Sequence, residues 1–173
     1  MIKLIKIIYS IFFSFYFLFF SNVNAQEKIK IGLLVPMTGE NKKIGESIIK
    51  AVGLAVKDID NNLIEIFPKD TATKANQTLK SAFELSEIGI KVVIGPVFYE
   101  SLTYLDEMKG MTFLSFTNKT LDLPKNVISA GINSTSQFNT IKKFLEINNI
   151  KKTVFLTPIR DYEFEIKQGM KYS

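Results

Sequence analysis

The stretch that decides the fold runs from Ile29 to Val52 and reads IKIGLLVPMTGENKKIGESIIKAV. Its first seven residues are mostly apolar and end at Pro36, which predicts a buried strand. A polar loop follows, and apolar residues then recur at spacings of three and four, as on one face of a helix. These residues are Ile44, Ile48, Val52, Ala55 and Ile59. The stretch therefore predicts a strand, a loop and a helix that ends near Asp60.

The same alternation continues along the chain. Further strands are predicted at residues 63–67, 91–94, 111–116, 127–130 and 153–157. One helix is predicted after Thr73, its cap, with an inner face of Ala75, Leu79, Ala82, Phe83 and Ser86, and with Gly89 just after its end. A second helix is predicted after Gly95-Pro96 and carries Leu102, Leu105 and Met108. A third is predicted to begin at a Ser134–Gln137 capping box. Its inner face would consist of Phe138, Ile141, Phe144 and Leu145. Strands that alternate with helices predict an α/β fold, a parallel sheet with helices on both faces.

The first 25 residues have the layout of a signal peptide. Lys3 and Lys6 precede an almost wholly apolar run at 7–20, and Val23-Asn24-Ala25 offers a cleavage site after Ala25. The alternative is an uncleaved membrane anchor, but the apolar run is short for a span of about 20 residues. The sequence therefore predicts residues 1–25 to be a cleavable signal peptide. Without cysteine, the secreted chain has no site for a lipid anchor.

Composition excludes several classes of function. Beyond the predicted signal, 20 basic and 17 acidic residues leave a net charge of +3, too small to favour nucleic acid. The absence of His and Cys excludes Cys nucleophiles, Ser-His pairs and the common metal sites. Gly32, Gly39 and Gly45 do not match a dinucleotide or phosphate-binding pattern. We therefore expect a protein that is not an enzyme, with no catalytic residues, no cofactor and no metal.

Ligands of parallel α/β sheets bind beyond the carboxyl ends of the strands. The loops there carry hydroxyl and amide groups, which suit a neutral or zwitterionic small solute. The candidate ligand-binding residues are Thr38, Tyr99, Ser101, Ser115 and Thr117. The serines could equally be caps or loop hydroxyls, Tyr99 could merely line a cleft, and Asp70 could be a loop or helix-capping acid. Gly95-Pro96 could be an anion-binding helix start or a plain tight turn.

Several motifs, in order, resemble the type I periplasmic solute-binding proteins of the leucine-binding class. They are the Pro36–Gly39 loop followed by Gly45, then IEIFPKDT, VVIGPVFYES and MTFLSFTN. LLVPMTG, PKDT, IGPVF, FLSFTN and AGINSTSQ are similar to one branch, the penicillin-binding protein activators. The resemblance implies a two-lobed fold with a complete first lobe at 27–131. Residues 132–173 would be the start of an incomplete, truncated second lobe.

The resemblance also implies two functions. The amino-acid binders place small hydroxyl residues after the Gly-Pro turn, where this chain has Phe98, Tyr99 and Glu100. After the fourth strand it has Thr117, Asn118 and Lys119, which would compete with a bound carboxylate for space. We therefore expect a non-enzymatic, periplasmic regulator whose partner is a cell-wall synthase, a penicillin-binding protein. The alternative is the substrate-binding component of an ABC importer, with a small polar solute such as an amino acid and the importer's membrane subunits as partners.

Overall fold

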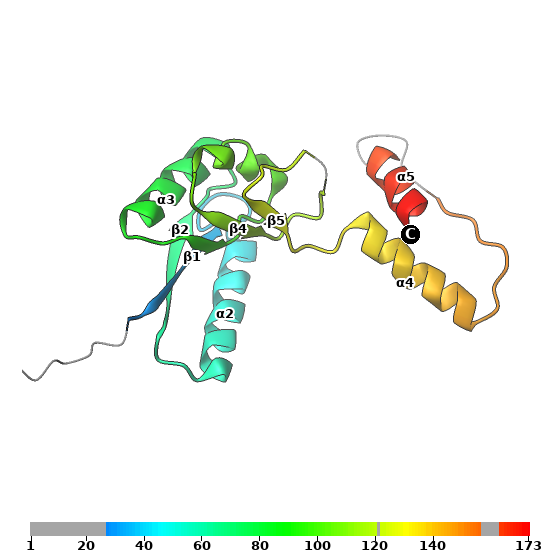
Figure 1. Ribbon diagram of the computed structural model, residues 1–173, viewed down its shortest axis with the longest axis horizontal. Coiled ribbons are helices and arrows are strands. Elements are labelled where there is room, and N and C mark those ends of the chain that lie inside the picture. Colours follow the sequence, from blue (N-terminus) through cyan, green and yellow to red (C-terminus); the bar gives the residue numbers. More distant parts are fainter. Residues whose placement is uncertain (1–26, 121, 157–162) are drawn as a thin grey trace, which may run out of the picture.

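The computed structural model describes residues 27–120, 122–156 and 163–173, so the predicted signal peptide lies outside the described residues. A five-stranded sheet comes first, and two helices, α4 and α5, follow it at the carboxyl end of the chain (Figure 1). Within the described ranges, no helix has both the length and the apolar character needed to cross a bilayer.

The sheet is parallel throughout, with the strand order β2-β1-β3-β4-β5. Its strands are β1 (Ile29–Val35), β2 (Ile64–Asp70), β3 (Val92–Ile94), β4 (Thr112–Ser115) and β5 (Val127–Ser129). The predicted α/β class is therefore confirmed, and five of the six predicted strands are present. The order changes direction at β1, which places the ends of β1 and β3 at the usual position of a ligand site.

Strand β2 is longer than predicted, because Pro68 does not end it. Pro68 lies opposite Leu33 in the ladder with β1. Since β2 is the edge strand, the missing N–H of proline costs no ladder hydrogen bond on its outer side. The strand continues to Asp70, so that this carboxylate lies at the carboxyl ends of the strands, where ligands of such sheets bind.

Four α-helices accompany the strands in the described residues: α2 (Lys42–Ile59), α3 (Ala75–Glu87), α4 (Ser134–Ile147) and α5 (Glu163–Tyr172). Gly89 was correctly predicted to follow α3, and it has a φ of +80°. The N–H of Gly89 donates to the carbonyl of Ser86, and the N–H of Ile90 donates to the carbonyl of Leu85. This pair of bonds is a Schellman motif, which turns the chain from α3 toward β3.

The inner faces of the helices were only partly predicted. On α2, Ile48 and Val52 are half-buried as expected, but Ala55 is exposed, as is Ile59 at 59%. On α3, Leu79 and Ala82 face inward, whereas Phe83 and Ser86 are exposed and Leu85 is fully buried. Both helices carry apolar residues next to the face that is buried. Spacing alone therefore did not determine which residues face the sheet.

The segment after Gly95-Pro96 is not the predicted α-helix. It forms two short 3₁₀ helices, η1 (Tyr99–Leu102) and η2 (Leu105–Glu107). Leu102, Leu105 and Met108 are nevertheless buried, as predicted. Their spacing of three matches the 3.0 residues per turn of a 3₁₀ helix, and this explains how three apolar residues face the core without an α-helix.

The core lies on one face of the sheet, under α3 and the 3₁₀ segment. It comprises Leu34, Ala82, Leu85, Ile90, Val93, Leu102, Leu105, Met108, Met111, Phe113 and Val127. The opposite face is less covered, since Ile29, Val92 and Ile128 are exposed there. The sheet therefore has one well-packed face and one partly open face.

The carboxyl-terminal part differs from the prediction at two places. Residues 151–156 form no strand, and Leu156 is 96% exposed; the last residue of the predicted strand, Thr157, lies outside the described residues. No neighbouring strand is present to pair with this segment among the residues described. Helix α4 is capped by Asn133 rather than Ser134: the Asn133 side chain accepts from the Ser136 N–H at 2.9 Å. In α4 none of the predicted inner residues is buried.

Candidate functional site

The carboxyl ends of β1, β3 and β4 bring three loops close together. This approach depends on two glycines. A Cβ at Gly45 would lie 1.9 Å from the Pro36 carbonyl oxygen, and one at Gly95 would lie 2.1 Å from the Leu34 oxygen. Gly95 also has a φ of +100°, which favours glycine. Side chains are therefore excluded from the places where α2 and the Gly95-Pro96 turn meet the end of β1.

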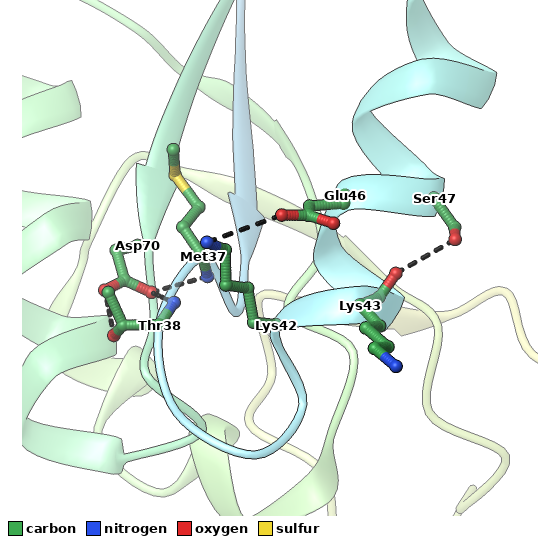
Figure 2. A network of polar contacts seen from close by, with 7 residues as sticks. All are labelled: Met37, Thr38, Lys42, Lys43, Glu46, Ser47 and Asp70. Atoms are coloured by element: carbon green, nitrogen blue, oxygen red, sulfur yellow. Dashed lines mark hydrogen bonds and ion pairs between the residues drawn. The ribbon is translucent and has the colours of Figure 1, made fainter.

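Asp70 joins the first two loops at this edge (Figure 2). Its carboxylate accepts hydrogen bonds from the Met37 N–H at 2.7 Å, the Thr38 N–H at 3.3 Å and the Thr38 hydroxyl at 2.6 Å. It also accepts from the N–H of Ala72 at 2.8 Å. Burial alone would raise the pKa of Asp70, but these hydrogen bonds, led by that of the Thr38 hydroxyl, outweigh it and lower the pKa. Asp70 is therefore a loop-fixing carboxylate.

The first turn of α2 continues this network on the surface. Lys42 and Glu46 form an ion pair at 3.5 Å, and the Ser47 hydroxyl donates to the Lys43 carbonyl (Figure 2). Both contacts lie within one exposed helix face, where such pairs contribute little stability. They orient no group toward the strand ends.

Ser115 and Thr117 lie together, but inside the protein. The Ser115 hydroxyl donates to the Pro96 carbonyl at 2.8 Å and accepts from the Thr117 N–H at 3.1 Å. The carbonyl of Thr117 accepts from the Ser129 hydroxyl at 2.7 Å. Both predicted residues are buried. Their hydrogen bonds connect the ends of β3, β4 and β5.

The other three predicted residues lie apart. Thr38 is exposed, and its hydroxyl donates to Asp70. Ser101 is 1% exposed in η1, and its hydroxyl has no partner among the described residues. Tyr99 is half-buried at the start of η1. Of the five predicted residues, only Thr38 and Tyr99 thus reach solvent.

Lys119 occupies the space beside Tyr99. Its ammonium nitrogen lies 4.1 Å from the centre of the Tyr99 ring and 4.0 Å from a carboxylate oxygen of Glu165 in α5. The Ser134 hydroxyl in α4 donates to the backbone carbonyl of Glu165 at 2.9 Å, which fixes this part of α5. Sequence reasoning named Lys119 as an obstacle to a ligand but missed Glu165, because no local signal connects positions so far apart.

Two hollows border these residues. One of about 310 Å³ is lined by Tyr99, Leu102, Thr103, Asp106, Asp122, Leu123 and Pro124. A smaller one of about 70 Å³ lies between the loop after β4 and the two last helices, lined by Asn118, Thr120, Ser134, Thr135, Glu165, Gln168, Gly169 and Tyr172. Within the ranges that the structure covers, no group of three carboxylate, His or Cys side chains is placed to hold a metal ion. The chemistry offered at this edge is binding through hydroxyl, amide, aromatic and ammonium groups.

Comparison with solved structures identifies the fold. No family model matches the sequence, and the search of curated proteins found no match. The carboxyl-terminal domain of LpoA from Haemophilus influenzae, a regulator of PBP1A, superposes with a TM-score of 0.67 at 18% identity, over 82% of this chain and 44% of that one. A leucine-binding protein, LivK from Thermotoga maritima, gives 0.57 at 16% identity, over 83% and 44%. This is a type I periplasmic-binding-protein fold.

The same fold occurs in a solute-binding protein of an ABC transporter from Rhodopseudomonas palustris, solved in complex with 3,4-dihydroxybenzoic acid. Its TM-score is 0.62 at 21% identity, over 83% of this chain and 43% of that one. The predicted resemblance to type I binding proteins is thus confirmed for the fold. The chain spans less than half the length of each of these proteins, and such low identities carry no residue's role from one to another.

Proposed function

We propose that the protein is a non-enzymatic periplasmic regulator of cell-wall synthesis that acts by surface contact with a penicillin-binding protein. The single observation that carries this proposal is the occupation of the strand-end edge by the protein's own contacts. Asp70 binds Thr38, Ser115 binds Pro96, and Lys119 lies between Tyr99 and Glu165. A solute receptor needs convergent polar groups that remain free for its ligand.

The similarity to LpoA supports the same proposal, because that protein is described as a regulator of PBP1A. A regulator of this kind needs a folded surface rather than an open pocket. The cross-connected loops supply a rigid one, since side-chain hydrogen bonds connect the ends of β2 and β1, of β3 and β4, and of β4 and β5. The proposed periplasmic location rests on the predicted signal peptide at 1–25.

The proposal is tested by binding and activity measurements with a cell-wall synthase purified from the same bacterium. We expect saturable binding in biolayer interferometry and a change in the rate of glycan polymerisation over the same concentration range. A leucine-binding protein of the same fold is the control, because the fold alone should not bind. Absence of binding to every synthase of the organism, with unchanged polymerisation rates, would contradict the proposal.

One observation favours a second candidate, a substrate-binding component of an ABC importer. The hollow beside Tyr99 has a volume of about 310 Å³, within the range of small-molecule sites. A ligand at a hundred times its Kd would stabilise the fold by about 2.7 kcal/mol, a rise in melting temperature of roughly 5–10 °C. A thermal-shift screen of amino acids and small polar solutes tests this. Tyr99→Ala should abolish the rise in melting temperature. Tyr104→Ala is the control, because Tyr104 is exposed, and it should leave the rise unchanged.

A further inference from the structure

A groove lies between the 3₁₀ segment and the loop that leads into β5. The hollow of about 310 Å³ beside Tyr99 adjoins a larger one of about 650 Å³, because Asp106, Leu123 and Pro124 line both. The larger hollow is further lined by Lys109, Gly110, Lys125 and Asn126. We call the two hollows together the side groove. Each of the two volumes is within the range of small-molecule sites.

The two walls of the side groove carry the same charge pattern. One wall, Asp106–Lys109, reads DEMK, and the other, Asp122–Lys125, reads DLPK. The smaller hollow is lined by both aspartates and by no lysine, whereas both lysines line the larger hollow together with Asp106 alone. The side groove is therefore acidic at one end, while at the other end two lysines outnumber one aspartate.

These four charges have no ion-pair partner among the residues that the structure describes. All four side chains are exposed. Two like charges close together in a groove repel each other, so each end would be stabilised by a bound group of opposite charge. An ammonium group fits the pair of aspartates, and a carboxylate fits the pair of lysines.

The Asn126 side chain holds the two walls together. Its amide nitrogen donates to the carbonyl of Leu105 at 2.7 Å and to that of Met108 at 3.2 Å. The floor of the groove is apolar, since Leu102 is buried and Leu123 packs against the core. A ligand therefore meets a preformed groove, which lowers the cost of binding.

The spacing of the charges selects the length of the ligand. In each wall the lysine follows the aspartate by three positions. Three residues advance about 6 Å in a 3₁₀ helix and about 10 Å in an extended chain. A peptide extends by about 3.3–3.6 Å per residue, so the terminal charges of two or three residues span this separation and those of a single amino acid do not. We propose that the side groove binds a dipeptide or tripeptide, with its amino terminus at Asp106 and Asp122 and its carboxylate at Lys109 and Lys125.

Titration of the isotope-labelled secreted protein with trialanine, followed by NMR, tests this proposal. We expect saturable shifts at the backbone amides of Gly110 and Asn126, which line the side groove. N-acetyl-trialanine and trialanine amide should each bind roughly fivefold more weakly, because each lacks one terminal charge. Free alanine should bind more weakly as well, because it cannot reach both ends of the groove.

Two double variants test the assignment of each end. Lys109→Gln/Lys125→Gln should bind trialanine about fivefold more weakly and should no longer distinguish it from trialanine amide. Asp106→Asn/Asp122→Asn should weaken binding similarly, but should lose the distinction between trialanine and its N-acetyl form. Because all four side chains are exposed, the fold should tolerate both variants.

The matched control is Lys43→Gln/Lys50→Gln, which removes two lysine charges from an exposed part of α2. It should bind every probe within about twofold of the unaltered protein, since only net charge changes. Absence of saturable shifts, or a preference for free termini that survives in both groove variants, would overturn the proposal. Free alanine that binds as tightly as trialanine would also overturn it, because it would assign the groove to a single amino acid. None of these outcomes depends on a cell-wall synthase, so the proposed function is tested separately.

Discussion

Replacing Asp70 by Asn tests whether one carboxylate holds the strand-end loops together. Asp70→Asn keeps an oxygen that can accept from the backbone N–H groups of Met37 and Ala72. It removes the second carboxylate oxygen, to which the Thr38 hydroxyl donates at 2.6 Å. It also removes the negative charge that strengthens all four hydrogen bonds.

The expected loss of stability follows from these bonds. Hydrogen bonds to charged groups contribute about 1.5–3 kcal/mol each, against about 1 kcal/mol for neutral ones. The Thr38 contacts with Asp70 are exposed to solvent, which weakens them. We therefore expect Asp70→Asn to lower the free energy of unfolding by about 1–2 kcal/mol. With a urea m-value of about 2 kcal/mol/M, the midpoint should fall by roughly 0.5–1 M.

The effect should depend on pH in a defined direction. The pKa of Asp70 in the folded state lies below its ordinary value of 3.8. The stabilisation is therefore fully present above the unfolded pKa and is lost as pH falls through the folded-state pKa. In urea titrations, the gap between the unaltered protein and Asp70→Asn should be constant above about pH 5 and should narrow below 3.8.

The control is Asp58→Asn, since Asp58 is exposed on α2 and should change stability by less than about 0.5 kcal/mol. Equal urea midpoints for Asp70→Asn and the unaltered protein at pH 7 would refute the loop-fixing role. So would a gap that stays constant down to pH 3, because it would show that the carboxylate's charge contributes nothing.

Three further substitutions test the packing and the capping of the helices. Gly45→Ala should lower the free energy of unfolding by about 3 kcal/mol, because its Cβ would lie 1.9 Å from the Pro36 carbonyl oxygen. Gly53→Ala is the control: open space surrounds Gly53, so this change should raise the free energy of unfolding by about 0.5–1 kcal/mol. Urea midpoints measure both, and a tolerated Gly45→Ala would contradict the close approach. Asn133→Ala should destabilise α4 by about 1 kcal/mol and speed hydrogen exchange at the Ser136 amide, and unchanged exchange would exclude the cap.

The strands could be predicted because their signals are local. An apolar run that ends at Pro36 needs no distant information, and the structure confirms it over the full predicted length. Strand β2 could not be bounded in this way, because Pro68 ends a strand or continues it depending on whether the strand is at an edge. The 3₁₀ segment was misread for a similar reason: Leu102, Leu105 and Met108 are three residues apart, a spacing that both helix types tolerate.

The sequence located the candidate side chains along the sheet but did not predict how far each is exposed to solvent. Ser115 and Thr117 do lie at the carboxyl end of β4, as the order of strands implied. Their burial depends on a distant residue, because a Cβ at Gly131 would lie 2.4 Å from the Thr117 carbonyl oxygen. Glu165 was missed because its role depends on the packing of α5 against α4. Hydroxyl groups can therefore be located from sequence, whereas their availability to a ligand cannot.

Lys119 separates the two candidate functions in energetic terms. A solute that stacks on the Tyr99 ring in place of Lys119 displaces this ammonium group from Tyr99 and Glu165, contacts that contribute about 1–2 kcal/mol together because the Lys119 side chain is 32% exposed. Displacement therefore weakens a solute by roughly tenfold without forbidding it. Lys119→Met should raise the affinity of a receptor for its solute by about that factor, measured by calorimetry. For a regulator that contacts its partner through the strand-end loops, Lys119→Met should weaken binding to the synthase, and unchanged binding would show that Lys119 lies outside the protein interface.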